Sequence, residues 1–156
     1  MTKVTIALST FAKLISSKQE DQIRDLQRYE TPGGYDLYRA TKSAVHDFIA
    51  ADENPNEVEA RLRNITSDLE RKKGLEIFQA VKSWRAKNKG VGFSPPRSVW
   101  KSPNNVFAVR VEPEIGIQQG GKRLIVSLYC TEGQPLTRAS AGAAIVLMQT
   151  ALESQL

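Results

Sequence analysis

Two glutamates, Glu112 and Glu114, flank Pro113 in a segment where apolar and polar residues alternate. Metal-dependent nucleases of the PD-(D/E)XK type carry one acid on the first strand of a hairpin. An acid and a lysine on the second strand complete the site, which holds a divalent cation and orients water. In this chain Ser127 and Tyr129 stand where the second acid and the lysine are needed. A nuclease-like enzyme using Glu112 and Glu114, or an inactive descendant of one, is therefore an alternative function. We expect both side chains to face solvent or to pair with Arg110 or Lys122.

His46 and Cys130 are the only histidine and the only cysteine of the chain. A nucleophilic pair needs both side chains within hydrogen-bond reach, whereas Cys130 ends an apolar stretch that is typical of a buried, inert thiol. Asp47 follows His46 directly, and adjacent residues on a helix point in different directions, so we expect Asp47 to point away from the imidazole. One Cys and one His are too few to form the spaced set of ligands that a zinc site requires. We therefore expect no catalytic residue, no metal and no cofactor.

A run of positive charge lies in the middle of the chain. Residues 71–101 contain nine Lys and Arg and one acid, a net charge of +8, which leaves −3 on the rest of a chain whose total is +5. Cations beside aromatic rings are typical of a groove for a nucleic-acid strand, with phosphates on the cations and bases on the rings. The predicted binding residues are Lys82, Arg85, Lys89, Arg97, Trp100 and Lys101.

The preferred hypothesis is a non-catalytic binding protein that uses this basic surface to hold nucleic acid or an acidic protein partner. A solvated basic helix face, with its aromatic residues in the core, would have the same composition. A structural role in an oligomer is a further alternative, because an exposed hairpin edge can pair with another chain. The oligomeric state stays open at this level.

Length and composition indicate the domain organisation, the charge of the partner and the location of the protein. A chain of 156 residues suits a single domain (1–156), with a helical part at 1–89 and a sheet plus terminal helix at 90–156. The net charge and a pI of about 9.4 favour anionic partners. No apolar stretch approaches a membrane span, and residues 1–14 lack the pattern of a secretion signal. We therefore expect a cytoplasmic protein without membrane contact.

Apolar spacing of three and four residues predicts the helices of the first half. The predicted ranges are 4–15, 19–29, 35–51 and a fourth helix through Val58 and Leu69 that continues to Trp84. Gly74 is either a joint between two helices or a tolerated weak point within one. Arg71-Lys72-Lys73-Gly74 resembles a helix C-terminus, with cations in the last turn and then glycine, so we favour the joint. Asn54 or Asn56 is a candidate N-cap for the fourth helix.

Residues 105–130 are predicted to form one long β-hairpin, with its turn at Gln119-Gly120-Gly121, and a short strand is expected near 98–101. Thr137 is a candidate N-cap for a last helix over 137–154. Its expected core stripe is Ala141, Ala144, Ile145, Met148 and Leu152. The predicted fold class is α+β: a helical N-terminal half packed on a small antiparallel sheet, with a C-terminal helix.

The second half of the chain also carries a recognisable order of motifs. Val109–Gly116 reads VRVEPEIG, followed by Gly121-Lys122, the apolar strand Ile125–Tyr129 and the helix Leu136–Met148. In this order the motifs resemble an uncharacterised bacterial protein family, whose C-terminal halves combine a VRV-x-PE-[IL]-G hairpin, a GK turn, an apolar strand ending in LY and a terminal helix. The resemblance covers roughly residues 90–150. It implies a fold and no activity.

Overall fold

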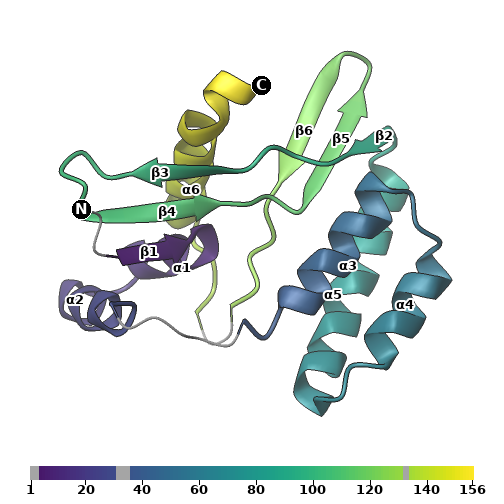
Figure 1. The fold of residues 1–156 in the computed structure, drawn as a ribbon, viewed down its shortest axis with the longest axis horizontal. Coiled ribbons are helices and arrows are strands. Elements are labelled where there is room, and N and C mark those ends of the chain that lie inside the picture. The colour runs from purple at the N-terminus through teal and green to yellow at the C-terminus, as the bar shows by residue number, and fades with distance from the viewer. Residues whose placement is uncertain (1–3, 31–35, 132–133) are drawn as a thin grey trace. The chain divides into compact units, whose positions relative to one another are not determined.

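The computed structural model describes residues 4–30, 36–131 and 134–156, which form six α-helices, one 3₁₀-helix and six strands in two sheets (Figure 1). The described chain divides into two compact units. Unit 1 comprises residues 4–30, 96–112, 129–131 and 134–156, and unit 2 comprises residues 36–95 and 113–128. These helices and mostly antiparallel strands, with a closing helix, confirm the predicted α+β class.

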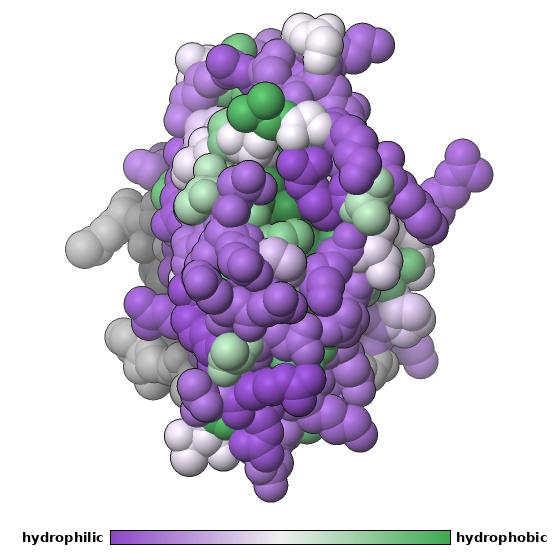
Figure 2. All heavy atoms as spheres, turned by 90° about the vertical axis from the view of Figure 1, so that its right-hand side faces the viewer, coloured by the Kyte–Doolittle hydropathy of each residue, from purple (hydrophilic) through white to green (hydrophobic). Residues whose placement is uncertain are grey.

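Hydrophilic residues predominate on the face of the molecule drawn in Figure 2, where hydrophobic residues form small, separate spots. Such a face offers charged and hydrogen-bonding groups to a partner rather than a broad apolar patch. Within the described ranges, no helix combines the length and the apolar character that crossing a membrane requires.

Unit 1 contains a three-stranded sheet and three α-helices. Its elements are β1 (Val4–Ala7), α1 (Leu8–Ile15), α2 (Gln19–Arg28), β3 (Ser98–Lys101), β4 (Phe107–Val111), α6 (Arg138–Leu152) and a 3₁₀-helix (Glu153–Gln155). The central strand is β4, which pairs in parallel with β1 and antiparallel with β3. Ala108, Val109 and Val111 of β4 are buried, in a sheet where α1 packs against β4 and α6 packs against β3. The predicted strand near 98–101 is confirmed.

The first predicted helix is wrong in its first turn, because Val4–Ala7 forms strand β1. Val4 and Ile6 are buried and Thr5 is exposed, the alternation of a strand. The partner of β1 is β4, with Val4 opposite Phe107. Pairing with a strand this distant along the chain overrides the local helical spacing, and β-branched side chains suit the pleated conformation.

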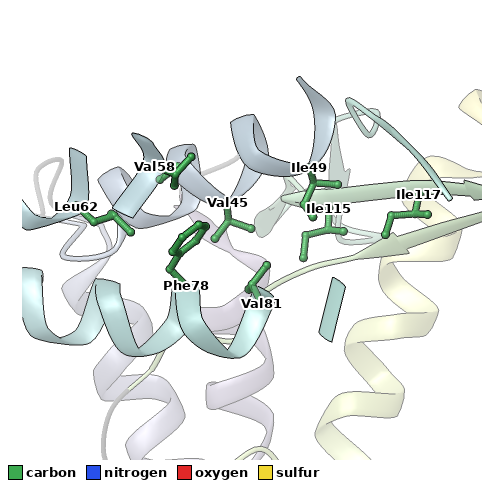
Figure 3. Packing of buried hydrophobic residues seen from close by; sticks show 9 residues of the cluster. Val45, Ile49, Val58, Leu62, Phe78, Val81, Ile115 and Ile117 are labelled. Atoms are coloured by element: carbon green, nitrogen blue, oxygen red, sulfur yellow. The ribbon is translucent and has the colours of Figure 1, made fainter. Parts of the chain in front are cut away.

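Unit 2 packs three helices against a second three-stranded sheet. Its elements are α3 (Arg39–Ala50), α4 (Pro55–Arg63), α5 (Asp68–Lys87), β2 (Val91–Phe93), β5 (Ile115–Gln119) and β6 (Lys122–Val126). Strand β5 is central and pairs antiparallel with both β2 and β6. The core of the unit lies between α3, α4, α5 and one face of this sheet (Figure 3), and its labelled members are Val45, Ile49, Val58, Leu62, Phe78, Val81, Ile115 and Ile117.

The predicted hairpin is confirmed at its turn but is shorter than expected. Gly120 and Gly121 both have positive φ, at 46° and 83°, as the tight two-residue turn between β5 and β6 demands. The first predicted arm is divided at Pro113, because β4 belongs to the sheet of unit 1 and β5 to the sheet of unit 2. Proline cannot donate to a strand ladder, so it suits this break. The strands therefore form two small sheets where the sequence indicated one.

The expected helix joint at Gly74 is wrong. Helix α4 ends at Arg63, with Asn64 as its C-cap. Ser67 caps α5 by accepting a hydrogen bond from the Glu70 amide at 3.4 Å, so Gly74 lies inside α5. A Cβ atom at Gly74 would lie 2.6 Å from Thr41 Oγ1. Gly74 therefore allows α5 to approach α3, which is a packing role and not a breaking one.

The predicted N-cap Thr137 is confirmed, and of the two candidates for α4 the structure has Asn54 as the N-cap and not Asn56. The Asn54 side chain accepts from the Asn56 amide at 2.9 Å, and Thr137 forms a reciprocal capping box with Ser140. The predicted stripe of α6 is wrong at Ile145, which is 50% exposed, whereas Leu147 is buried. The caps depend only on neighbours in sequence, while the buried face depends on what the helix packs against.

Candidate functional site

The six predicted binding residues belong to different units. Lys82, Arg85 and Lys89 lie in unit 2, and Arg97, Trp100 and Lys101 lie in unit 1.

Lys82 of α5 has a local counterion. Its Nζ lies 3.5 Å from Glu59 Oε2 of α4 and 5.9 Å from the centroid of the Phe78 ring. Hydrogen bonds from Arg63 and Gln79 to Glu59, together with the charge of Lys82, hold the pKa of Glu59 below its ordinary value. This carboxylate therefore stays ionised beside Lys82, and Lys82 joins α5 to α4.

Arg85 ties the end of α5 to the start of β2. Its Nη1 donates to the Asn88 carbonyl and its Nη2 donates to the Gly90 carbonyl, each at 2.7 Å. A helix C-terminus leaves carbonyl groups without intrahelical partners, and a guanidinium can satisfy two acceptors at once. Arg85 thus positions the edge strand of the unit 2 sheet.

Lys89 is exposed and lies beside the hairpin of unit 2. Gln119 Nε2 donates a hydrogen bond to the Lys89 carbonyl, and Gln119 pairs with Lys122 across the turn. Arg123 follows and is also exposed. Lys89, Lys122 and Arg123 therefore gather at the turn end of the sheet. The Lys-Arg pair directly after the Gly-Gly turn was the signal in the sequence for the two further cations.

Phe93 of β2 lies on the outer face of this sheet, away from the core. It pairs with Gly116 of β5, and a Cβ atom at Gly116 would lie 2.9 Å from Phe93 Cε2 and Cζ, so the ring covers the glycine. The Arg123 guanidinium carbon lies 5.7 Å from the centroid of the ring. Val91, two residues before Phe93 and hence on the same face, is 73% exposed. The outer face therefore presents an aromatic ring with a cation above it.

The charge on this part of unit 2 has one sign. Residues 85–95 and 115–128 supply β2, β5 and β6 with their flanking residues, and they contain five Lys and Arg and no Asp or Glu. Arg85 is engaged with backbone carbonyls, as described, which leaves the exposed cations Lys87, Lys89, Lys122 and Arg123. This set, with Phe93, is called the basic sheet face below; Arg123 lies on the same side of the sheet as Phe93, whereas Lys122, its neighbour on β6, lies on the other side at the turn.

In unit 1, Trp100 belongs to an aromatic pair. Its ring centroid lies 5.8 Å from that of Phe107, with the planes tilted by 56°, and the side chain is half-buried on β3. Arg97 and Lys101 are exposed, and the Arg97 carbonyl accepts a hydrogen bond from Gln155 Nε2 at 3.3 Å. Trp100 therefore contributes to packing on the sheet of unit 1.

The two glutamates of the nuclease hypothesis lie in different environments. Glu112 is exposed, as expected, but the expectation that Glu114 faces solvent is wrong, because Glu114 is 9% exposed and accepts from the Leu128 amide at 2.7 Å. Burial raises the pKa of Glu114, against the opposing effects of the Leu128 amide and the charge of Lys42. Among the described residues, no three His, Cys, Asp or Glu side chains are grouped to hold a metal ion. The nuclease hypothesis gains no support from this arrangement.

The expectation that Asp47 points away from His46 is wrong. His46 Nδ1 lies 3.2 Å from Asp47 Oδ1, and His46 Nε2 lies 2.9 Å from Ser94 Oγ. The sequence offered no signal for Ser94, since it is 48 residues from His46. Cys130 is half-buried in unit 1.

No protein-family model, no curated protein and no solved structure matches this chain. The resemblance of its second half to the bacterial family therefore stays a prediction.

Proposed function

We propose that the basic sheet face of unit 2 binds single-stranded nucleic acid and that this binding is non-catalytic. The observation that carries the proposal is the position of Arg123 over Phe93 on the outer face of the sheet. Single-strand binding proteins place aromatic rings for bases beside cations for phosphates. The bases of a single strand are free to stack on such a ring, whereas those of a duplex are not.

The ring favours nucleic acid over an acidic protein as the partner. Carboxylates need only cations, while a base can stack on Phe93 when Arg123 moves from the ring to the phosphate of that base. Base–aromatic stacking contributes about 1–3 kcal/mol per base. The proposed setting is the cytoplasm, which suits a chain with a single cysteine.

Of the residues predicted from sequence, Lys89 stays in this proposal as a phosphate contact. Lys82 and Arg85 are left out, since Lys82 pairs with Glu59 of α4 and Arg85 holds backbone carbonyls before β2. Three phosphate contacts, through Lys89, Lys122 and Arg123, correspond to a slope of about −2 when log K is plotted against log salt for a single strand.

The test is fluorescence anisotropy with a labelled oligothymidine over a series of salt concentrations. Phe93→Leu keeps an apolar side chain over Gly116 but removes the ring, and is expected to weaken binding by roughly tenfold. The double variant Lys122→Gln/Arg123→Gln is expected to weaken binding and to reduce the slope by about 1.4.

A matched control removes the same charge elsewhere. Lys18→Gln/Lys72→Gln replaces two exposed lysines outside the basic sheet face and is expected to leave affinity nearly unchanged. Absence of binding at low salt, or equal losses in both double variants, would exclude the proposed site. Competition by polyglutamate with no effect of Phe93→Leu would point to an acidic protein partner instead.

A further inference from the structure

Ser94, His46 and Asp47 of unit 2 form a continuous chain of hydrogen bonds. Asp47 Oδ1 lies 3.2 Å from His46 Nδ1, and Ser94 Oγ lies 2.9 Å from His46 Nε2. An ionised carboxylate can only accept, so in the neutral imidazole the proton is on Nδ1 and Nε2 is the acceptor for the Ser94 hydroxyl. This is the order of groups that activates a serine nucleophile.

The acid of this chain is itself held in place. Asp47 Oδ2 lies 3.2 Å from Arg61 Nη2 of α4, and the same nitrogen lies 3.1 Å from Glu53 Oε2. The Asp47 carbonyl accepts from the Ala51 amide at 3.0 Å within α3. One oxygen of Asp47 is thus engaged by arginine, which leaves the other to orient the imidazole.

The serine is positioned by the strand that precedes it and the prolines that follow. Ser94 comes directly after β2. The ring of Pro95, which is buried, follows it and restricts Ser94 to extended conformations. At Gly92 a Cβ atom would lie 1.7 Å from the Ile49 carbonyl oxygen of α3. The absence of a side chain at Gly92 therefore lets β2 approach the helix that carries His46.

We propose that Ser94 is a nucleophile for acyl transfer, with His46 as its general base and Asp47 as the residue that orients His46, and that its substrates are carboxylic esters. Ser94 is exposed and the His46 side chain is 26% exposed, so an ester on the surface can reach both.

The reaction needs only the ester and water. As Ser94 Oγ bonds to the carbonyl carbon, His46 Nε2 takes the hydroxyl proton. The carbon–oxygen bond to the alcohol then breaks, and the alcohol leaves with the proton from His46. Water repeats these steps at the acyl-serine, which releases the carboxylic acid and restores Ser94.

This site is separate from the basic sheet face. Residues alternate between the two sides of a strand, so Ser94 faces α3 while Phe93 faces outward. The two proposals are therefore tested on different residues, Phe93 for nucleic-acid binding and Ser94 for acyl transfer.

The first test uses a fluorophosphonate probe on the full chain. Ser94 Oγ attacks phosphorus, fluoride leaves and the proton passes to His46. The expected result is one adduct per chain by intact mass, located on Ser94 by peptide mapping and absent in Ser94→Ala. The control Ser83→Ala, at an exposed serine of α5, should label like the wild type. An unlabelled wild type, or an adduct on another residue, overturns the proposal.

The second test follows hydrolysis of p-nitrophenyl acetate, with circular dichroism of each variant as a check of folding. Ser94→Ala and His46→Gln are each expected to lose roughly 100-fold or more in rate, and Asp47→Asn more than about tenfold. If Ser94→Ala stays active while His46→Gln does not, His46 attacks the ester by itself and the serine nucleophile is excluded.

Discussion

Gly74 of α5 and Thr41 of α3 face each other inside unit 2, where a Cβ atom at position 74 would lie 2.6 Å from Thr41 Oγ1. The contact depends on glycine because Thr41 is fully buried and cannot move toward solvent. Any side chain at position 74 must displace a packed residue, since protein interiors have little free volume.

Gly74→Ala is therefore expected to lower the free energy of unfolding by about 1–3 kcal/mol, although alanine is the better helix former. Thr41→Ala removes the opposing hydroxyl and methyl, so the double variant should lose less stability than the sum of the two single variants. Urea unfolding of the four proteins measures this coupling. Strict additivity would show that the two residues do not touch.

The Thr41 hydroxyl is also expected to lower the stability of the folded chain. Among the described side chains it is one of two buried polar groups without a hydrogen-bond partner. Thr41→Val replaces this hydroxyl with a methyl group of similar size and is expected to raise the free energy of unfolding by about 1 kcal/mol. A loss of stability in urea unfolding would mean that the hydroxyl has a partner in solution.

Glu114 is expected to make stability depend on pH. Burial raises its pKa in the folded chain above the ordinary value of 4.5, so the folded state holds the proton more tightly than the unfolded state. The stabilising contribution of the protonated carboxyl is complete below about pH 4.5. It is lost as pH rises through the folded pKa.

Glu114→Gln removes this titration but can still accept from the Leu128 amide through its side-chain oxygen. The stability of the variant relative to the wild type is therefore expected to increase between pH 4 and pH 7. Urea unfolding of both proteins at the two pH values checks the sign. A difference that is constant, or that decreases as pH rises, contradicts the raised pKa.

Gly92 and Gly142 differ in the space available for a side chain. A Cβ atom at Gly92 would lie 1.7 Å from the Ile49 carbonyl oxygen, whereas nothing lies within 4 Å of one at Gly142 in α6. Gly92→Ala is expected to lower the free energy of unfolding by at least about 2 kcal/mol, because backbone atoms must move. Gly142→Ala is expected to raise the free energy of unfolding by about 0.5–1 kcal/mol, because alanine favours the helix. Thermal unfolding compares the two, and equal effects would contradict the close approach of β2 to α3.

Local features of this protein were predictable from the sequence because they depend on residues a few positions apart. The caps at Asn54 and Thr137 and the turn at Gly120-Gly121 follow from the neighbours that they contact. The α+β class follows from the spacing of apolar residues along each segment. The excess of positive charge in residues 71–101 is likewise a property of the sequence itself.

Only the tertiary structure determined which remote segments of the chain contact one another. Strand β1 formed because β4 pairs with it, Gly74 became a packing residue because Thr41 opposes it, and Ser94 reached His46 because β2 lies against α3. Each of these outcomes depends on a partner remote in the chain. Periodicity and propensity carry no information about such a partner, since they describe only the preferences of a segment taken by itself.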